Sequence, residues 1–202
     1  LLESADFIYA EDTRNTNNLL INFNINKKSK SFHEHNEIKI TPEIINQLND
    51  GNKIAIITDA GAPCISDPGY YLSQECIKHN IQYTVLPGPS SVINALILSG
   101  LPSDAFSFKG FFPRKKTDQI EMSKSLNDVS ETIIFFESAK RLEKTISVFA
   151  EYLEFDRRII LCREMTKKYE EVIRDSVGNM NNKFKNNEIT TKGEFVIVLE
   201  GS

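Results

Sequence analysis

Two short stretches of this sequence combine residue types that could do chemistry. Residues 59–69 read DAGAPCISDPG, and residues 10–14 read AEDTR. The first stretch is rich in small residues, which let a ligand reach backbone N–H and C=O groups that a bulky side chain would cover. The second sets two carboxylates, a hydroxyl and a guanidinium side by side, and such groups can take up a proton or hold a phosphate. The sequence therefore predicts a binding loop and a polar cluster.

Each stretch follows an apolar run that predicts a β-strand. Residues 53–58 are nearly all apolar, which is typical of a strand covered on both faces in a parallel sheet, and residues 6–10 form a second short strand. Ligands bind open α/β sheets outside the carboxyl ends of the strands, so both stretches are expected at that edge.

A structural explanation exists for both stretches. The loop could be no more than a strand-to-helix connection, with Ser66 or Asp67 as the N-cap and Pro68 at the first position of a helix over residues 70–80. The connection is about ten residues long, however, whereas most connections between a strand and a helix are shorter, so a binding loop is favoured. In the polar cluster, Asp12 or Thr13 could be the N-cap of an amphipathic helix with Arg14 in solvent, and both interpretations remain open.

A third loop, PGPSS at residues 87–91, follows a predicted strand over residues 81–86 and precedes a helix over residues 91–98. It is expected at the same sheet edge as the first loop, one β-α unit further on, although a turn with a serine cap would look the same. In SFHEHNE (residues 31–37), His33 and His35 would share one face of a strand, which permits metal binding. No third and fourth ligands follow at suitable spacing, so we expect no metal and a polar strand end instead.

The second half of the chain repeats one pattern: a predicted strand followed by basic residues. Strands are predicted over residues 106–112, 132–136, 157–162 and 193–199, while residues 169–174 could be helix or strand. A hinge at residues 101–105 is expected to separate domains 1–103 and 104–202. Each basic group alone would be interpreted as a solvated face, but their recurrence indicates a positively lined cleft for phosphates. The basic residues are Arg114, Lys115, Lys116, Lys140, Arg141, Arg163, Lys167 and Lys168.

Composition narrows the class of protein. Of the 202 residues, 40% are hydrophobic and 26% charged, as in ordinary soluble globular proteins. No apolar run is long enough for a membrane span, and no signal peptide opens the chain. The three cysteines lack CxxC spacing, which argues against a disulfide framework or a zinc site and fits a reducing cytoplasm. A net charge of -4 argues against a protein coated in basic surface but does not exclude nucleic acid.

The ordered motifs resemble one family. AEDTR, SFHEHNE, DAGAPCISDPG, PGPSS, FKGFFPRK, FFESAKR, REMTKKYEE and GEFVIVLEG run along nearly the whole chain. Together they resemble the ribosomal RNA small-subunit methyltransferase I family, cytidine 2'-O-methyltransferases with the tetrapyrrole-methylase fold. Members of that family begin with a further strand and a Gly-Thr-Pro-Ile-Gly-Asn type loop, and they continue into a helical tail. The sequence is therefore expected to be a fragment lacking the first strand and the C-terminal tail.

The resemblance implies an α/β fold with an N-terminal parallel α/β domain and a C-terminal mixed-sheet α/β domain. It also implies that S-adenosylmethionine binds in the cleft between the two domains, and that the protein is a cytoplasmic homodimer. The cofactor residues carried over by motif are Ala60, Gly61, Ala62, Ile65, Ser90, Ser91, Glu137, Thr166, Glu194 and Phe195.

The implied reaction is 2'-O-methylation of a cytidine ribose near the decoding centre, in small-subunit ribosomal RNA or the assembled 30S subunit. We hypothesise that Glu11 or Asp12 takes or orients the ribose proton while Arg14 holds a phosphate. Two other functions stay open: a methylase for a tetrapyrrole or another small acceptor, and a non-catalytic cofactor or RNA-binding module. The residues expected to bind RNA are Arg114, Lys115, Lys116, Arg141, Arg163 and Lys167.

Overall fold

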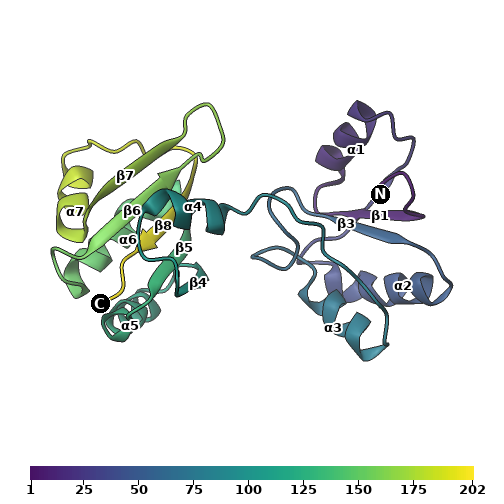
Figure 1. The fold of residues 1–202 in the computed structure, drawn as a ribbon, viewed down its shortest axis with the longest axis horizontal. Coiled ribbons are helices and arrows are strands. Elements are labelled where there is room, and N and C mark those ends of the chain that lie inside the picture. Colours follow the sequence, from purple (N-terminus) through teal and green to yellow (C-terminus); the bar gives the residue numbers. More distant parts are fainter. The chain divides into compact units, whose positions relative to one another are not determined.

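A computed structural model describes residues 1–202, which form two compact units, Leu1–Pro89 and Ser90–Ser202 (Figure 1). The sequence places the domain boundary after residue 103, whereas the structure groups residues 90–103 with the second unit. The reason lies in the helix α4 (Ser91–Ser99), whose Val92, Ala95 and Leu96 pack against the second sheet. None of the helices is long and apolar enough to cross a membrane.

The first unit is a parallel three-stranded sheet in the order β2-β1-β3, with helices on both faces (Figure 1). Alternation along β1 sends Ile8 to the face covered by Leu20 and Tyr9 to the face covered by Ile44 and Leu72. Its elements are β1 (Phe7–Ala10), α1 (Thr13–Asn22), β2 (Ser29–Ser31), α2 (Glu37–Asn49), β3 (Ile54–Ile57) and α3 (Tyr70–Lys78).

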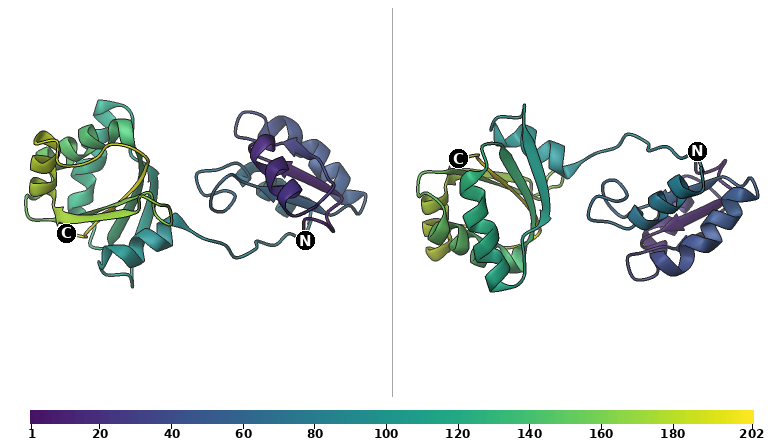
Figure 2. Two further views of the ribbon diagram at one scale, coloured as in Figure 1. Left: turned by 90° about the horizontal axis from the view of Figure 1, so that it is seen from above. Right: turned by 90° about the horizontal axis from the view of Figure 1, so that it is seen from below.

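The second unit is a five-stranded mixed sheet in the order β4-β5-β8-β6-β7. Strands β4 and β5 are parallel, and β8 is antiparallel to both β5 and β6. One face packs on α5, α6 and α7, and the other packs on α4 (Figure 2). The elements are β4 (Phe106–Phe111), α5 (Lys116–Ser125), a 3-10 turn (Leu126–Asp128), β5 (Thr132–Ser138), α6 (Ala139–Tyr152), β6 (Arg158–Arg163), β7 (Glu171–Ser176), α7 (Val177–Lys185) and β8 (Glu194–Leu199).

The predicted fold class, a parallel α/β unit followed by a mixed-sheet α/β unit, is confirmed. The strand predicted over residues 81–86 is wrong. Residues 81–90 contain no strand, and Tyr83, Val85 and Leu86 are exposed. An apolar run becomes a strand only when a neighbouring strand accepts its backbone hydrogen bonds, and this segment has no such neighbour.

Three local expectations also change. Helix α2 begins at Glu37 and contains Pro42, instead of beginning at residue 41, and the strand before it ends at Ser31, so His33 and His35 lie in a turn. The segment that could be helix or strand is the strand β7, because it pairs along its whole length with β6. Helix α3 begins at Tyr70 with Gly69 as its N-cap, so neither Ser66 nor Asp67 caps it.

Candidate functional site

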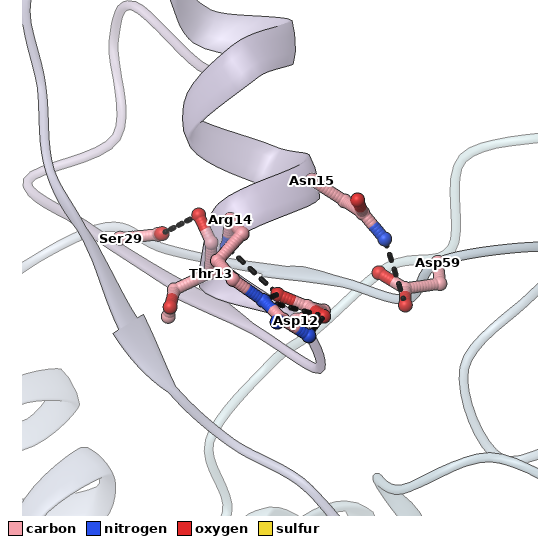
Figure 3. A network of polar contacts seen from close by, with 6 residues as sticks. All are labelled: Asp12, Thr13, Arg14, Asn15, Ser29 and Asp59. Carbon is pink, nitrogen blue, oxygen red and sulfur yellow. Dashed lines mark hydrogen bonds and ion pairs between the residues drawn. The ribbon is translucent and has the colours of Figure 1, made fainter.

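The polar cluster after β1 lies beside the loop after β3, because these two strands are parallel neighbours. The Glu11 N–H donates to the Ile57 carbonyl at 3.0 Å, and the Glu11 Oε2 accepts a hydrogen bond from the Asp59 N–H at 3.1 Å. Asn15 Nδ2 donates to Asp59 Oδ2 at 3.2 Å from the first turn of α1 (Figure 3). The structure thus brings the AEDTR motif and the start of the DAGAPCISDPG loop together at one sheet edge.

Asp12 is the N-cap of α1, and its carboxylate also holds Arg14 (Figure 3). Asp12 Oδ1 accepts from the Arg14 backbone N–H at 2.8 Å, and the Arg14 guanidinium donates to both carboxylate oxygens. These bonds to Arg14 lower the pKa of Asp12 to about 2. Asp12 therefore stays ionised with both oxygens occupied, which makes it a poor proton acceptor and a good anchor for Arg14.

Arg14 keeps donors for a ligand despite this pairing. Its side chain is 86% exposed, and Asp12 bonds only to the Nε and Nη2 atoms. A guanidinium carries five N–H donors, so the Nη1 group remains available to an anion. Glu11 likewise keeps one free carboxylate oxygen, since only Oε2 is bonded.

The loop after β3 bends through an unusual number of left-handed residues. Gly61, Cys64 and Ser66 have φ of 77°, 72° and 65°. Nothing lies within 4 Å of the position where a Cβ would stand on Gly61, so its backbone is open to a ligand. The flanking Ala60 is exposed and Ile65 is 48% exposed. The loop has the open backbone that the sequence predicts for a binding loop.

Asp67, which the sequence suggests only as a helix cap, is a further candidate. Its partial burial, followed by the negative charges of Glu11 and Asp59, raises its pKa to about 6. A carboxyl with such a pKa exchanges protons near neutral pH. Only the folded chain reveals this, because Glu11 follows β1 whereas Asp59 and Asp67 lie in the loop after β3.

The SFHEHNE motif has a structural role that its histidines do not suggest. Glu37 Oε1 accepts hydrogen bonds from the Gly69 N–H at 2.9 Å and the Leu72 N–H at 3.2 Å, so it caps α3 from the first turn of α2. The Asn36 side chain in turn holds the His33 N–H at 2.8 Å. No group of three His, Cys, Asp or Glu side chains converges in a way that could hold a metal ion.

In the second unit, two predicted cofactor residues begin α4 and a third follows β6. Ser90 is the N-cap of α4, where its Oγ accepts from the Ile93 N–H, and Ser91 is the first helical residue. Thr166 lines a hollow of about 290 Å³ on the α4 side of the sheet, and its N–H donates to Glu170 Oε2 at 2.6 Å. The other lining residues are Asn94, Ile97, Leu98, Met165 and Glu170. The hollow thus has an apolar wall and three polar side chains.

Glu137, Glu194 and Phe195 share the same end of the second sheet, since Glu137 pairs with Phe195 across β5 and β8. Glu137, however, is fully buried. Its carboxylate accepts from Thr145 Oγ1 at 2.7 Å and from the Ser138 N–H at 2.7 Å, and it lies 3.2 Å from the Arg141 Nη2. With these bonds made, Glu137 supports the local structure and offers no exposed oxygen to a ligand. Phe195 is also buried in the core, whereas Glu194 is exposed.

The six predicted RNA-binding residues separate into two groups. Arg114, Lys115 and Lys116 are exposed, and none of them forms an ion pair. The other three are committed within the chain, as the following bonds show. Arg141 binds the carbonyls of Phe112 and Pro113, Arg163 binds the Lys192 carbonyl and Glu171, and Lys167 pairs with Glu164 and Glu194.

Comparison with known proteins identifies the family. The family described as Tetrapyrrole (Corrin/Porphyrin) Methylases matches residues 1–181. A protein named ribosomal RNA small subunit methyltransferase I, from Halalkalibacterium halodurans, is 41% identical over 201 residues, which cover 100% of this chain and 68% of the relative. The chain belongs to the ribosomal RNA small subunit methyltransferase I family of the tetrapyrrole methylases.

Several solved structures share this fold. Diphthine synthase matches 98% of this chain and 81% of its own, with a TM-score of 0.73 and 13% identity. A uroporphyrin-III C-methyl transferase from Thermus thermophilus, complexed with S-adenyl homocysteine, matches 99% of this chain and 87% of its own, with a TM-score of 0.60 and 13% identity. Sequence identities this low support a shared fold but not a shared function, so the chemistry of the site must be inferred from the residues of this chain.

Proposed function

We propose that this protein transfers a methyl group from S-adenosylmethionine to the 2'-oxygen of a cytidine ribose in small-subunit ribosomal RNA, near the decoding centre. The observation that carries the proposal is the 41% identity, over the full length of this chain, to a protein named ribosomal RNA small subunit methyltransferase I. The exposed, unpaired cations at the end of β4 support an RNA substrate, because phosphate contacts provide most of the affinity for nucleic acid. A cytoplasmic homodimer acting on the RNA or the assembled 30S subunit accords with this reaction.

The residues present fit S-adenosylmethionine. In the first unit, Ala60, Gly61 and Ala62 offer backbone groups that no Cβ obstructs at the glycine. In the second unit, the apolar wall of the Thr166 hollow suits a purine ring, and its polar side chains suit hydroxyl and amino groups. Ile65, Ser90, Ser91 and Glu194 are the further contacts we propose, while Glu137 and Phe195 would act by shaping the end of the sheet. A uroporphyrin-III C-methyl transferase of the same fold is complexed with S-adenyl homocysteine.

The bound cofactor supplies a methyl group that its sulfonium already activates. The task of the protein is therefore chiefly to align the ribose oxygen with that methyl group. Alignment can supply about 7–11 kcal/mol, whereas a general base adds typically 10²–10⁴-fold, or roughly 3–5 kcal/mol. Positioning of the RNA by Arg14 and the basic residues is thus expected to matter more than proton removal.

Glu11 is the proton acceptor we propose from the pair left open by the sequence. Its Oε1 is free of hydrogen bonds, whereas Arg14 occupies both oxygens of Asp12 and lowers the pKa of Asp12 to about 2. Asp12 would then orient Arg14, and Arg14 would hold a phosphate next to the target ribose. The proton would leave the ribose hydroxyl for Glu11 as the oxygen–methyl bond forms, while the methyl–sulfur bond breaks and leaves the sulfonium as a neutral thioether.

The test is methyl transfer from labelled S-adenosylmethionine under single-turnover conditions, with isolated small subunits as one acceptor and a porphyrin precursor as the other. Transfer to the RNA supports the proposal, and transfer to the porphyrin alone would replace it with a small-acceptor methylase. If calorimetry shows cofactor binding but neither acceptor is methylated, the protein is a binding module.

The same assay separates the roles of the two carboxylates. Glu11→Gln should lower the single-turnover rate by 10²-fold or more, because it removes the proton acceptor. Asp12→Asn should chiefly weaken RNA binding, because it releases Arg14. Near-wild-type rates for both variants would refute the assignment while leaving the overall reaction intact.

A further inference from the structure

Strand β4 ends in a β-bulge that changes the direction of one aromatic side chain. Phe108 pairs with Ile134 and Phe111 with Phe136, so β4 advances by three residues while its partner β5 advances by two. The extra residue sits beside Gly110, whose φ is 70°. Residues three apart in a regular strand point to opposite faces, but the bulge returns Phe111 to the face of Phe108. Bulges that redirect side chains are frequent next to functional sites.

The ring of Phe111 remains open to solvent after this adjustment. Phe111 and Phe108 both contact the Phe136 ring, with centroid separations of 5.6 Å and 4.7 Å, yet Phe111 is 56% exposed. No lysine or arginine lies over its face. Its outer face is therefore an unoccupied aromatic surface supported from behind by Phe136. It lies on the α4 side of the sheet, which also carries the Thr166 hollow.

Four basic residues lie close to Phe111 in the sequence, and none of them is paired with a carboxylate. Lys109, Arg114, Lys115 and Lys116 are exposed and take part in none of the ion pairs of the chain. Lys109 and Arg114 lie on either side of residues 110–113, and Gln119 and Arg141 hold the end of this segment by donating to the Pro113 carbonyl at 2.8 Å each. The exposed ring of Phe111 thus has four free positive charges within five residues of it in the sequence.

The combination of an exposed aromatic ring with unpaired cations indicates which kind of ligand would bind here. An apolar protein surface would cover the ring but leave the cations without partners, and a free phosphate would satisfy the cations but leave the ring exposed. An unpaired nucleotide offers a π-face and a phosphate together, and single-stranded nucleic acids are bound in this combined way. We propose that Phe111 stacks on an unpaired base of the RNA substrate while the adjoining cations hold its phosphates. This inference rests on the proposed function and adds the strandedness of the RNA that the site accepts.

The chain contains no tryptophan, which provides a direct reporter. Phe111→Trp places a single indole at the surface, and Phe155→Trp is the matched control. Phe155 has the same exposed fraction of 56% but follows α6, away from the cation run. Each full-length variant is titrated with single-stranded oligocytidine RNA and with duplex RNA, and labelled RNA reports binding by anisotropy. Single-stranded RNA should quench the Phe111→Trp fluorescence and leave the control unchanged.

Substitutions at the ring distinguish stacking from simple apolar contact. Phe111→Leu should raise the Kd for single-stranded RNA about 5- to 150-fold, the equivalent of losing one stacked base, and Phe111→Tyr should restore it. Because the ring neutralises no phosphate, the slope of log K against log salt should not change in Phe111→Leu. Thermal melting of each variant establishes that the fold is retained.

Five outcomes would overturn the inference, and they separate it from the function on which it rests. If oligocytidine binds but the introduced indole is not quenched, the RNA substrate stands and stacking fails. Equal quenching by duplex RNA would likewise exclude an unpaired base, as would wild-type binding by Phe111→Leu. Burial of the indole as protein concentration rises without RNA would show that a second copy covers the ring. If the wild-type chain binds no RNA, both the inference and the proposed function fail.

Discussion

Removing the three free cations of the β4–α5 connection should flatten the salt dependence of RNA binding. Arg114, Lys115 and Lys116 have no carboxylate partner, so each is available to one phosphate. One neutralised phosphate of a single strand contributes about 0.7 to the slope of log K against log salt. The variant with all three changed to Gln should therefore lose about 2 from that slope. When the salt concentration rises fourfold, the factor by which the affinity falls should be roughly twentyfold smaller for the variant than for the wild type.

The measurement is anisotropy of labelled single-stranded RNA over a salt series, and Lys167→Gln is the matched control. Lys167 carries the same charge at the same sheet end, but Glu164 and Glu194 hold it at 3.0 Å and 2.9 Å. Its replacement should leave the slope unchanged, because a lysine held by two carboxylates neutralises no phosphate and so releases no counterion. Equal slope changes for Lys167→Gln and Lys115→Gln would show that overall charge, not pairing, governs binding, and would refute the reasoning.

Two further predictions concern the first unit. The pKa of Asp67 is raised to about 6 in the folded protein, above its value of about 3.9 in the unfolded chain. Between these two pH values the folded protein binds a proton that the unfolded chain has lost. The free energy of unfolding therefore falls as the pH rises from about 4 to about 6. Asp67→Asn should thus add about 1 kcal/mol at pH 7, after discounting for solvent, and nothing at pH 4; equal gains at both pH values in thermal melts would contradict this. Glu37→Ala should cost about 1 kcal/mol in urea unfolding, because two N–H groups of α3 lose their acceptor. Glu34→Ala, whose side chain is 79% exposed, is the control, and an equal loss there would exclude capping as the cause.

The sequence by itself determined the fold class and most of the elements. The apolar run at residues 133–135 reports burial directly, because a strand inside a packed core favours apolar side chains, whereas the run at residues 54–57 predicts a strand that is only half-buried. Glycines and caps such as Asp12 and Ser90 mark helix starts through bonds within a few residues. Signals that depend on neighbours in the chain can be recognised without a structure.

The tertiary structure alone decided which charges are free. Arg141 and Lys115 look alike in the sequence, yet one binds the carbonyls of Phe112 and Pro113 and the other has no ion-pair partner. Asp67 acquires its raised pKa from partial burial, from Glu11 after β1 and from Asp59 in its own loop, and the 81–86 run fails to form a strand because no strand pairs with it. Electrostatic and hydrogen-bond energies depend on distances between groups far apart in the sequence, and only the folded chain sets those distances.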